Sequence, residues 1–100
     1  MDQIGTLSFG GEEISIQVTT YSADGSPAIE LYDEEGMPYT TFSVCLPDSQ
    51  LQPDEVLVKT WSENEDLRQP ILDTGLFADT GRRVSSGFVN AEVWRFTKPN

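Results

Sequence analysis

The sequence predicts an α+β fold, an antiparallel β-meander of about five to six strands with one helix packed on a face. Three features predict it. Short apolar runs alternate with polar residues at a period of two, turn-forming residues separate these runs, and residues 62–75 carry the start and stop signals of a helix. A chain of 100 residues suffices for one core, so residues 1–100 are treated as a single domain.

Turn-forming residues divide the chain into short extended runs. The clearest turns are Gly10-Gly11 and the acidic Glu34-Glu35-Gly36, each between two apolar runs. Period-two alternation in residues 28–33, the run before the acidic turn, points Ile29 and Leu31 toward the core. The predicted strands are residues 4–9, 14–21, 28–33, 39–46, 55–60 and 88–97, with residues 84–86 as a short further strand that pairs with an earlier one.

Large apolar residues mark the predicted core. Alternation in the fourth run places Phe42, Val44 and Leu46 on one face of a strand. Trp94 lies in the last run beside other alternating apolar residues, which predicts a core position. Trp61 precedes the helix, and we predict that it either packs under the helix or lies at an interface.

One helix is predicted from Ser62 onward. In the segment Ser62-Glu63-Asn64-Glu65, the Ser62 hydroxyl can cap the free amides of the first turn and Glu65 can reach back to the cap. Gly75 is placed to end the helix in a left-handed conformation. Pro70 is discordant, because an interior proline removes a hydrogen bond, and it predicts a kink or a short helix interrupted by a tight turn.

Charge is the most unusual property of the sequence. The chain has 17 acidic and 6 basic residues, a net charge of −11. Residues 1–58 hold 11 of the acids and no lysine or arginine, whereas residues 59–100 hold six acids and all six bases. The whole net charge therefore belongs to the first part of the chain.

This charge narrows the classes of partner. Nucleic acids and anionic membranes are polyanions and are repelled by such a field, whereas a basic protein surface is attracted. We therefore predict a basic surface of a protein, one that itself binds nucleic acid, as the partner. The alternative is that the acidity only keeps a small protein soluble. No long apolar stretch and no signal-peptide pattern is present, and Cys45 is the single cysteine, so we expect a cytoplasmic protein.

Residues suited to catalysis are few. Histidine, the commonest general base and a common metal ligand, is absent. Cys45 has apolar neighbours in sequence and is assigned a packing role. The acids at 33–35 and 63–66 are typical of a solvated turn and a helix start, and Arg82-Arg83 of ion pairs. We predict no catalytic residue, metal or cofactor, and a small carboxylate enzyme is the least favoured alternative.

The candidate binding residues lie in the acidic part of the chain. Same-face side chains along a strand are about 6.6 Å apart, so carboxylates there can form a regular anionic array that mimics DNA. Tyr32 is included because exposed tyrosines are favoured at interfaces. The predicted binding residues are Glu30, Tyr32, Asp33, Glu34, Glu35, Asp54 and Glu55.

Several short motifs resemble a family of short acidic bacterial proteins of unknown function. The motifs are Lys59-Thr60-Trp61-Ser62-Glu63-Asn64-Glu65, Gly75-Leu76, Gly81-Arg82 and Ser86-Gly87-Phe88-Val89. The resemblance extends over most of the chain and departs at Pro70, where the family implies an uninterrupted helix. That family is associated with plasmids, phages and conjugative elements, and it transfers no catalytic residues. It implies a setting in which small acidic proteins inhibit host defence, as anti-CRISPR or anti-restriction proteins do.

Overall fold

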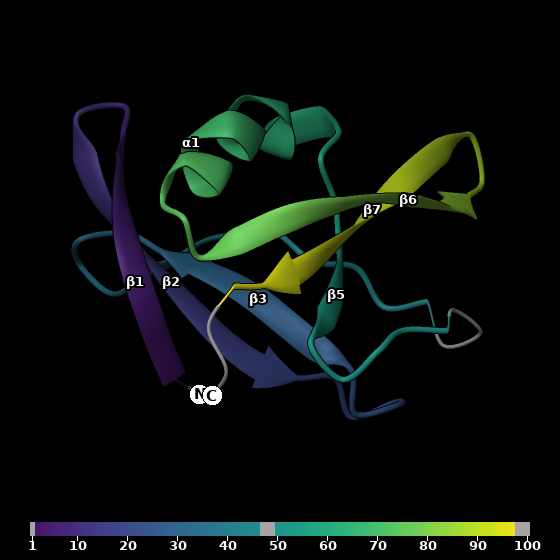
Figure 1. The fold of residues 1–100 in the computed structure, drawn as a ribbon. Coiled ribbons are helices and arrows are strands. Elements are labelled where there is room, and N and C mark those ends of the chain that lie inside the picture. The colour runs from purple at the N-terminus through teal and green to yellow at the C-terminus, as the bar shows by residue number, and fades with distance from the viewer. Residues whose placement is uncertain (1, 47–49, 98–100) are drawn as a thin grey trace.

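A computed structural model describes residues 2–46 and 50–97 (Figure 1). These residues form two antiparallel sheets of four and three strands, with one short helical segment. The strands are β1 (Asp2–Phe9), β2 (Glu12–Thr20), β3 (Pro27–Tyr32), β4 (Pro38–Thr41), β5 (Glu55–Val58), β6 (Phe77–Ser86) and β7 (Val89–Phe96). The α+β class is confirmed, but the prediction of a single five- to six-stranded meander is wrong.

Sheet A is the four-stranded sheet, in which β1, β2, β3 and β4 follow each other in sequence order. Gly10 and Gly11 form the two-residue turn between β1 and β2, and both have the positive φ that such a hairpin turn requires. On β3, Ile29 and Leu31 are fully buried, as the alternation predicted. This part of the fold follows directly from local pattern and turn chemistry.

Sheet B contains β5, β7 and β6 in that order, and the chain enters it where the predicted fourth strand breaks. The Phe42 amide donates to the Ile29 carbonyl of sheet A, while the Phe42 carbonyl accepts from Lys59 beside sheet B. Strand β4 therefore ends at Thr41, and one residue later the chain is bonded to both sheets. Residues 47–49 of the predicted loop at 47–54 lie outside the described residues.

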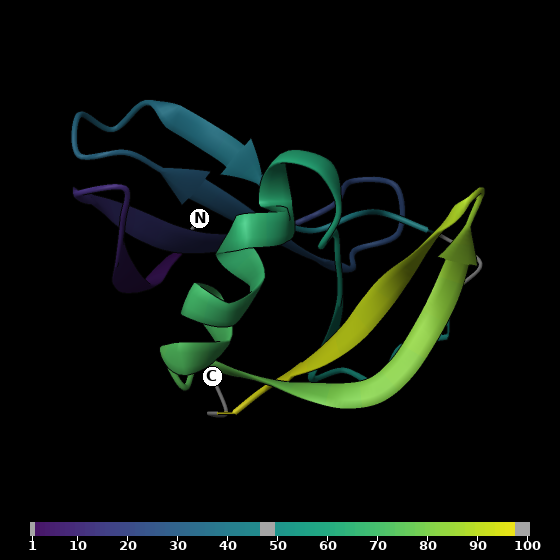
Figure 2. The same cartoon turned by 90° about the horizontal axis from the view of Figure 1, so that it is seen from above.

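The main core lies between the two sheets and under the helical segment. Its centre is aromatic, because the ring of Trp94 lies 5.4 Å from that of Phe42 and 5.9 Å from that of Phe77, each pair tilted. Trp94 is fully buried, as predicted. Figure 2 shows the helical segment crossing above the space between the sheets.

A second, smaller apolar cluster covers the other face of sheet B. Its buried members are Leu57, Ala91 and Val93. Val44 and Leu46 pack here and not beside Phe42, so the prediction that these three residues share one face is wrong. Trp61 and Leu51 join the same cluster, and Trp61 is half-buried there rather than beneath the helix.

The first half of the helical segment differs from the prediction in its helix type and in its N-terminal cap. A 3₁₀ helix, η1 (Ser62–Leu67), precedes the α-helix α1 (Arg68–Asp73). Trp61 is the cap residue, no side chain caps the helix, and Ser62 has a φ of 60°, so the predicted capping box does not form. Asn64 is fully buried instead, and its amide group donates to the carbonyls of Thr41 and Lys59.

Pro70 and Gly75 explain the second half of this segment. Pro70 is the third residue of α1, in the first turn, where amide groups lack helical partners and a proline is tolerated. The segment therefore changes from 3₁₀ to α just before the proline. Gly75 has a φ of 78° and follows the C-cap residue Thr74, as predicted for a left-handed helix end.

Strand β6 was largely missed by sequence reasoning. It begins at Phe77 and its pairing with β7 shifts between Asp79 and Arg83, where Gly81 has a φ of 86°. This irregularity hides the period-two pattern from a sequence search. Residues 84–86 do form a strand, but they pair with β7 across the Gly87-Phe88 turn and not with an earlier strand.

Candidate protein-binding surface

Acidic residues of sheet B are paired with bases, and this pairing determines which charges remain free. Four of the described bases form ion pairs with acids on sheet B, next to it or in η1. The pairs are Lys59–Glu63, Arg68–Asp79, Arg68–Glu92, Arg82–Glu55, Arg83–Asp79 and Arg83–Glu92. Arg95 faces Glu55 across the β5–β7 pair. Arg82-Arg83 thus makes the ion pairs that the sequence favoured.

Glu92 is the centre of the largest of these networks. Its side chain lies on the same face of β7 as Trp94 and is only 8% exposed. It accepts hydrogen bonds from the Trp94 indole, the Thr60 hydroxyl and the Arg68 guanidinium at 2.9–3.0 Å. Burial is the strongest single influence and raises the pKa of Glu92, but the hydrogen bonds outweigh it and the pKa is lowered.

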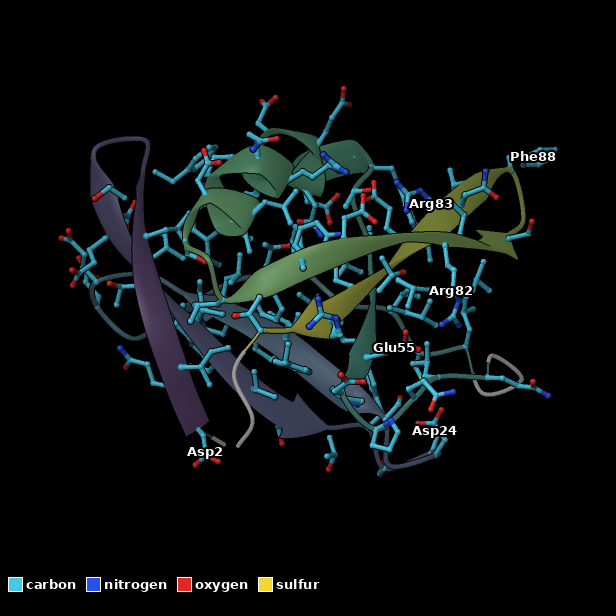
Figure 3. All side chains as sticks on the ribbon, viewed as in Figure 1. Asp2, Asp24, Glu55, Arg82, Arg83 and Phe88 are labelled. Atoms are coloured by element: carbon cyan, nitrogen blue, oxygen red, sulfur yellow. The ribbon has the colours of Figure 1, made fainter. Side chains whose placement is uncertain are left out.

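Glu55 was predicted to be a surface contact, but the structure places it in an internal ion pair. It is 6% exposed, and both of its carboxylate oxygens lie 2.8 Å from the Arg82 guanidinium (Figure 3). The Gln52 amide donates to the same carboxylate, and this bond is the strongest influence lowering the pKa of Glu55. Glu55 therefore stabilises the loop before β5 and is not available to a partner.

Asp54 is exposed but lies apart from the other candidates. Its position before β5 is near the Glu55 end of the molecule, whereas the β3–β4 turn with residues 33–37 lies at the opposite end (Figures 1 and 3). Its backbone carbonyl accepts from the Phe96 amide. The structure therefore does not bring Asp54 together with the acids at 33–35.

The β3–β4 turn holds its acids in a defined arrangement. A single carboxylate oxygen of Asp33 accepts from the amides of Glu35 and Met37, both at 2.9 Å. Gly36, with a φ of 80°, allows the chain to reverse. Asp33 is thus used within the turn, and the side chain of Glu35 is exposed to solvent.

A second turn brings two further acids to the same place. The Glu34 carboxylate accepts from the Glu13 amide at 2.9 Å, which joins the β3–β4 turn to the start of β2. Glu12 follows the Gly10-Gly11 turn, and this turn and the β3–β4 turn lie at the same end of the molecule (Figures 1 and 2). We call this group the acidic end; its members are Glu12, Glu13, Asp33, Glu34 and Glu35.

Two features distinguish the acidic end from sheet B. None of its carboxylates forms an ion pair with any residue in 2–46 or 50–97. It also adjoins β4 and the residue before it, where Met37 is 58% and Tyr39 42% exposed. Sequence reasoning omitted Glu12 and Glu13, although the Gly10-Gly11 hairpin signal placed them at a turn.

The outward face of sheet A does not carry the predicted carboxylate array. Glu30 lies opposite Gln17 on β2 and opposite Thr41 on β4, and it accepts a hydrogen bond from the Thr41 hydroxyl at 2.9 Å. Tyr32 is half-buried and lies opposite Ser15. The neighbours of Glu30 across the sheet are therefore uncharged, and the free acids gather at the turns instead.

Other kinds of site find little support in the described residues. In 2–46 and 50–97, no group of three or more potential metal ligands comes together. No helix in that part of the chain is long and apolar enough to cross a membrane. No family profile, curated protein or solved structure matches this sequence significantly. The family resemblance inferred from short motifs therefore stays a prediction.

Proposed function

We propose that this chain is a non-catalytic binding protein whose acidic end docks on a basic surface of another protein. The observation that carries the proposal is that the acidic end has five carboxylates without a described basic partner, whereas sheet B pairs its acids with bases. Unpaired surface charge attracts a basic partner over about one Debye length, roughly 8 Å at physiological salt.

The geometry of the acidic end supports binding by a preformed surface. Asp33 fixes the β3–β4 turn and Glu34 joins it to β2, so the surface loses little conformational freedom when a partner binds. Met37 and Tyr39 supply apolar contacts beside the charge. A surface of this composition fits a basic site that has some exposed apolar area, such as a nucleic-acid-binding groove.

The kind of partner follows from the charge and from the family resemblance together. A groove that binds nucleic acid is strongly positive, because its lysines and arginines neutralise the phosphates. A protein of a mobile genetic element that occupies such a groove would act as an anti-CRISPR or anti-restriction inhibitor. In this form the carboxylates displace DNA as competing anions, without the regular spacing of a DNA strand.

Two variants with the same net charge test the proposal. The first neutralises the acidic end through Glu12→Gln, Glu13→Gln and Glu35→Gln, which leaves both turn-holding acids in place. The control neutralises three acids elsewhere through Asp54→Asn, Glu65→Gln and Asp66→Asn. Each tagged protein is used to capture host proteins at about 50 mM and about 500 mM salt, a range over which exposed charge becomes screened.

The expected result is a basic, nucleic-acid-binding protein that the wild type and the control capture at low salt and release at high salt. The acidic-end variant should not retain it, and the captured protein should lose its DNA when wild type is added. Equal capture by both variants, or capture that is independent of salt, would contradict the proposal.

An adaptor module that is acidic only for solubility is the alternative, and one observation favours it. Phe88 is fully exposed at the tip of the β6–β7 hairpin, far from the acidic end (Figure 3). An exposed aromatic side chain at the tip of a hairpin is typical of an apolar contact. This alternative predicts binding that depends weakly on salt, tolerates charge reversal at Glu34 and Glu35, and is lost in Phe88→Ala.

A further inference from the structure

Sheet edges expose unpaired backbone groups, and folded proteins protect them with prolines, charges, bulges or covering segments. Strand β4 is protected in two of these ways. It begins at Pro38 and has only four residues. Buried Asn64 then covers it, because its amide group donates to the Thr41 carbonyl and its oxygen accepts from the Thr40 hydroxyl.

The two edges of sheet B are protected as well. Residues 42–44 cover β5, since Val44 donates to the Leu57 carbonyl and Phe42 accepts from Lys59. Strand β6 has an irregular pairing between Asp79 and Arg83, and it carries two adjacent arginines. A bulge with charged side chains is a common way to prevent a further strand from adding.

Strand β1 has one of these protections, an irregular pairing with β2 between Gln3 and Gly5, and residues 6–9 beyond it have none. It extends over eight residues, contains no proline, and its only charged residue is Asp2 at its start. One edge of β1 pairs with β2. Among residues 2–46 and 50–97, none forms a backbone hydrogen bond with its other edge. The helix α1 contacts β1 but does so from the core.

The hairpin fixes which groups of β1 point away from the sheet. In a two-residue hairpin the residues flanking the turn, here Phe9 and Glu12, exchange backbone hydrogen bonds. Alternate residues then point outward, so Thr6 and Ser8 direct their amides and carbonyls away from β2. Both residues are exposed, and Gly10 beyond them leads directly to the acidic end.

Charge determines which strand fits this edge. An antiparallel second copy would bring together two chains that each carry a net charge of −11, and this like charge opposes pairing. A segment with basic residues at its ends instead meets Asp2 at the start of β1 and the acidic end beyond the Gly10-Gly11 turn. We propose that the outer edge of β1 from Thr6 to Phe9 binds an extended segment of a protein partner, flanked by lysine or arginine, as an added strand.

This inference rests on the proposed function, because the added strand belongs to the same basic partner that the acidic end attracts. The two are nevertheless separable. Charge attraction needs only the carboxylates, whereas strand addition needs the outward backbone groups of Thr6 and Ser8.

A peptide probe tests the inference. The probe has ten residues, with alternating valine and threonine in the middle and two lysines at each end. A control peptide of equal charge has proline at two central positions and cannot pair as a strand. Binding and amide hydrogen exchange are followed by NMR for the wild type, for Thr6→Pro and for Ser85→Pro.

Ser85→Pro is a control on another edge strand, because Ser85 occupies on β6 the outward position that Ser8 occupies on β1, one residue before the pair that flanks the turn. Proline at such an outward edge position removes no hydrogen bond of the sheet. The strand peptide should bind the wild type and Ser85→Pro and slow exchange of the Thr6 and Ser8 amides about tenfold or more. Thr6→Pro and the proline peptide should each abolish this protection.

Three results would overturn the inference. If both peptides shift only the amides of the acidic end, then attraction by charge is real and strand addition is wrong. If neither peptide binds at low salt, the proposed function fails together with the inference. If the wild type sediments as a dimer and Thr6→Pro as a monomer, then a second copy occupies this edge and not a basic segment. The comparison of the two peptides on the wild type does not depend on how well Thr6→Pro folds.

Discussion

Sheet A and sheet B differ in whether their acidic residues are paired with bases. Sheet B holds acids that face inward or are covered, and these acids form ion pairs with Arg68, Arg82 and Arg83. The turns of sheet A hold acids that no described base neutralises. The comparison teaches that paired and unpaired acids are separated between the two sheets, because the acids of sheet B form ion pairs and those at the turns of sheet A form none with a described residue.

The largest effect on stability is expected at Glu92, where the pairing in sheet B is most buried. Glu92→Ala removes the acceptor of the Trp94 indole and leaves Arg68 without one of its two carboxylates. We expect the free energy of unfolding to fall by about 3 kcal/mol, since a broken, largely buried network is among the most destabilising changes. Urea unfolding measures this free energy. The same substitution at exposed Glu35 should change it by less than about 0.5 kcal/mol, and similar losses at the two sites would break the comparison.

The pH dependence should also distinguish the sheets. The pKa of Glu92 is lowered in the folded protein, so the unfolded chain binds the proton more readily at acid pH. The contribution of Glu92 is therefore complete above the ordinary glutamate pKa of about 4.3 and is lost as the pH falls through the lowered value. The stability difference between wild type and Glu92→Gln should be largest near neutral pH and should shrink in acid. A constant difference from neutral to strongly acid pH would be inconsistent with this account.

A smaller effect is expected where an acid of sheet A has a structural role. Asp33→Ala removes the acceptor of two turn amides, and we expect a loss of about 1 kcal/mol in thermal or urea unfolding. Asp33→Asn keeps an acceptor oxygen and should lose less. If Asp33→Ala is as neutral as Glu35→Ala, then the acidic end is not a preformed surface.

The smallest effect is expected at Pro70, between the sheets. Because Pro70 lies in the first turn of α1, Pro70→Ala should change stability by less than about 1 kcal/mol. A proline that kinked the interior of a helix would instead be relieved by about 3 kcal/mol on replacement. If differential scanning calorimetry showed that Pro70→Ala stabilises the protein by that amount, the predicted kink at Pro70 would be correct.

Local signals made part of the fold predictable. Gly10-Gly11, the alternation around Ile29 and Leu31, and the helix end at Gly75 each depend on neighbours in sequence, and each appears as expected. The break at Phe42 depends on contacts with both sheets, which no local pattern records. Strand β6 was missed because its irregular pairing between Asp79 and Arg83 interrupts the period-two pattern.

The candidate site was predictable to a similar extent. The turn at 33–35 was found because consecutive acids before a glycine mark an exposed turn. Glu55 was misjudged because its partner Arg82 is 27 residues away, and a charged residue at the start of a strand ordinarily faces solvent. Glu12 and Glu13 were overlooked because only strand pairing brings them beside Glu34.

Mapping a basic peptide onto the surface tests the central claim most directly. In an NMR titration with a ten-residue lysine peptide at low salt, we predict that the largest amide shifts occur at residues 10–13 and 33–37 and disappear as salt screens the charges. The helix acids Glu65, Asp66 and Asp73 and the paired acids of sheet B should shift little. Shifts of equal size at the helix acids and at the acidic end would contradict the account, because the free charge would then form no distinct binding surface.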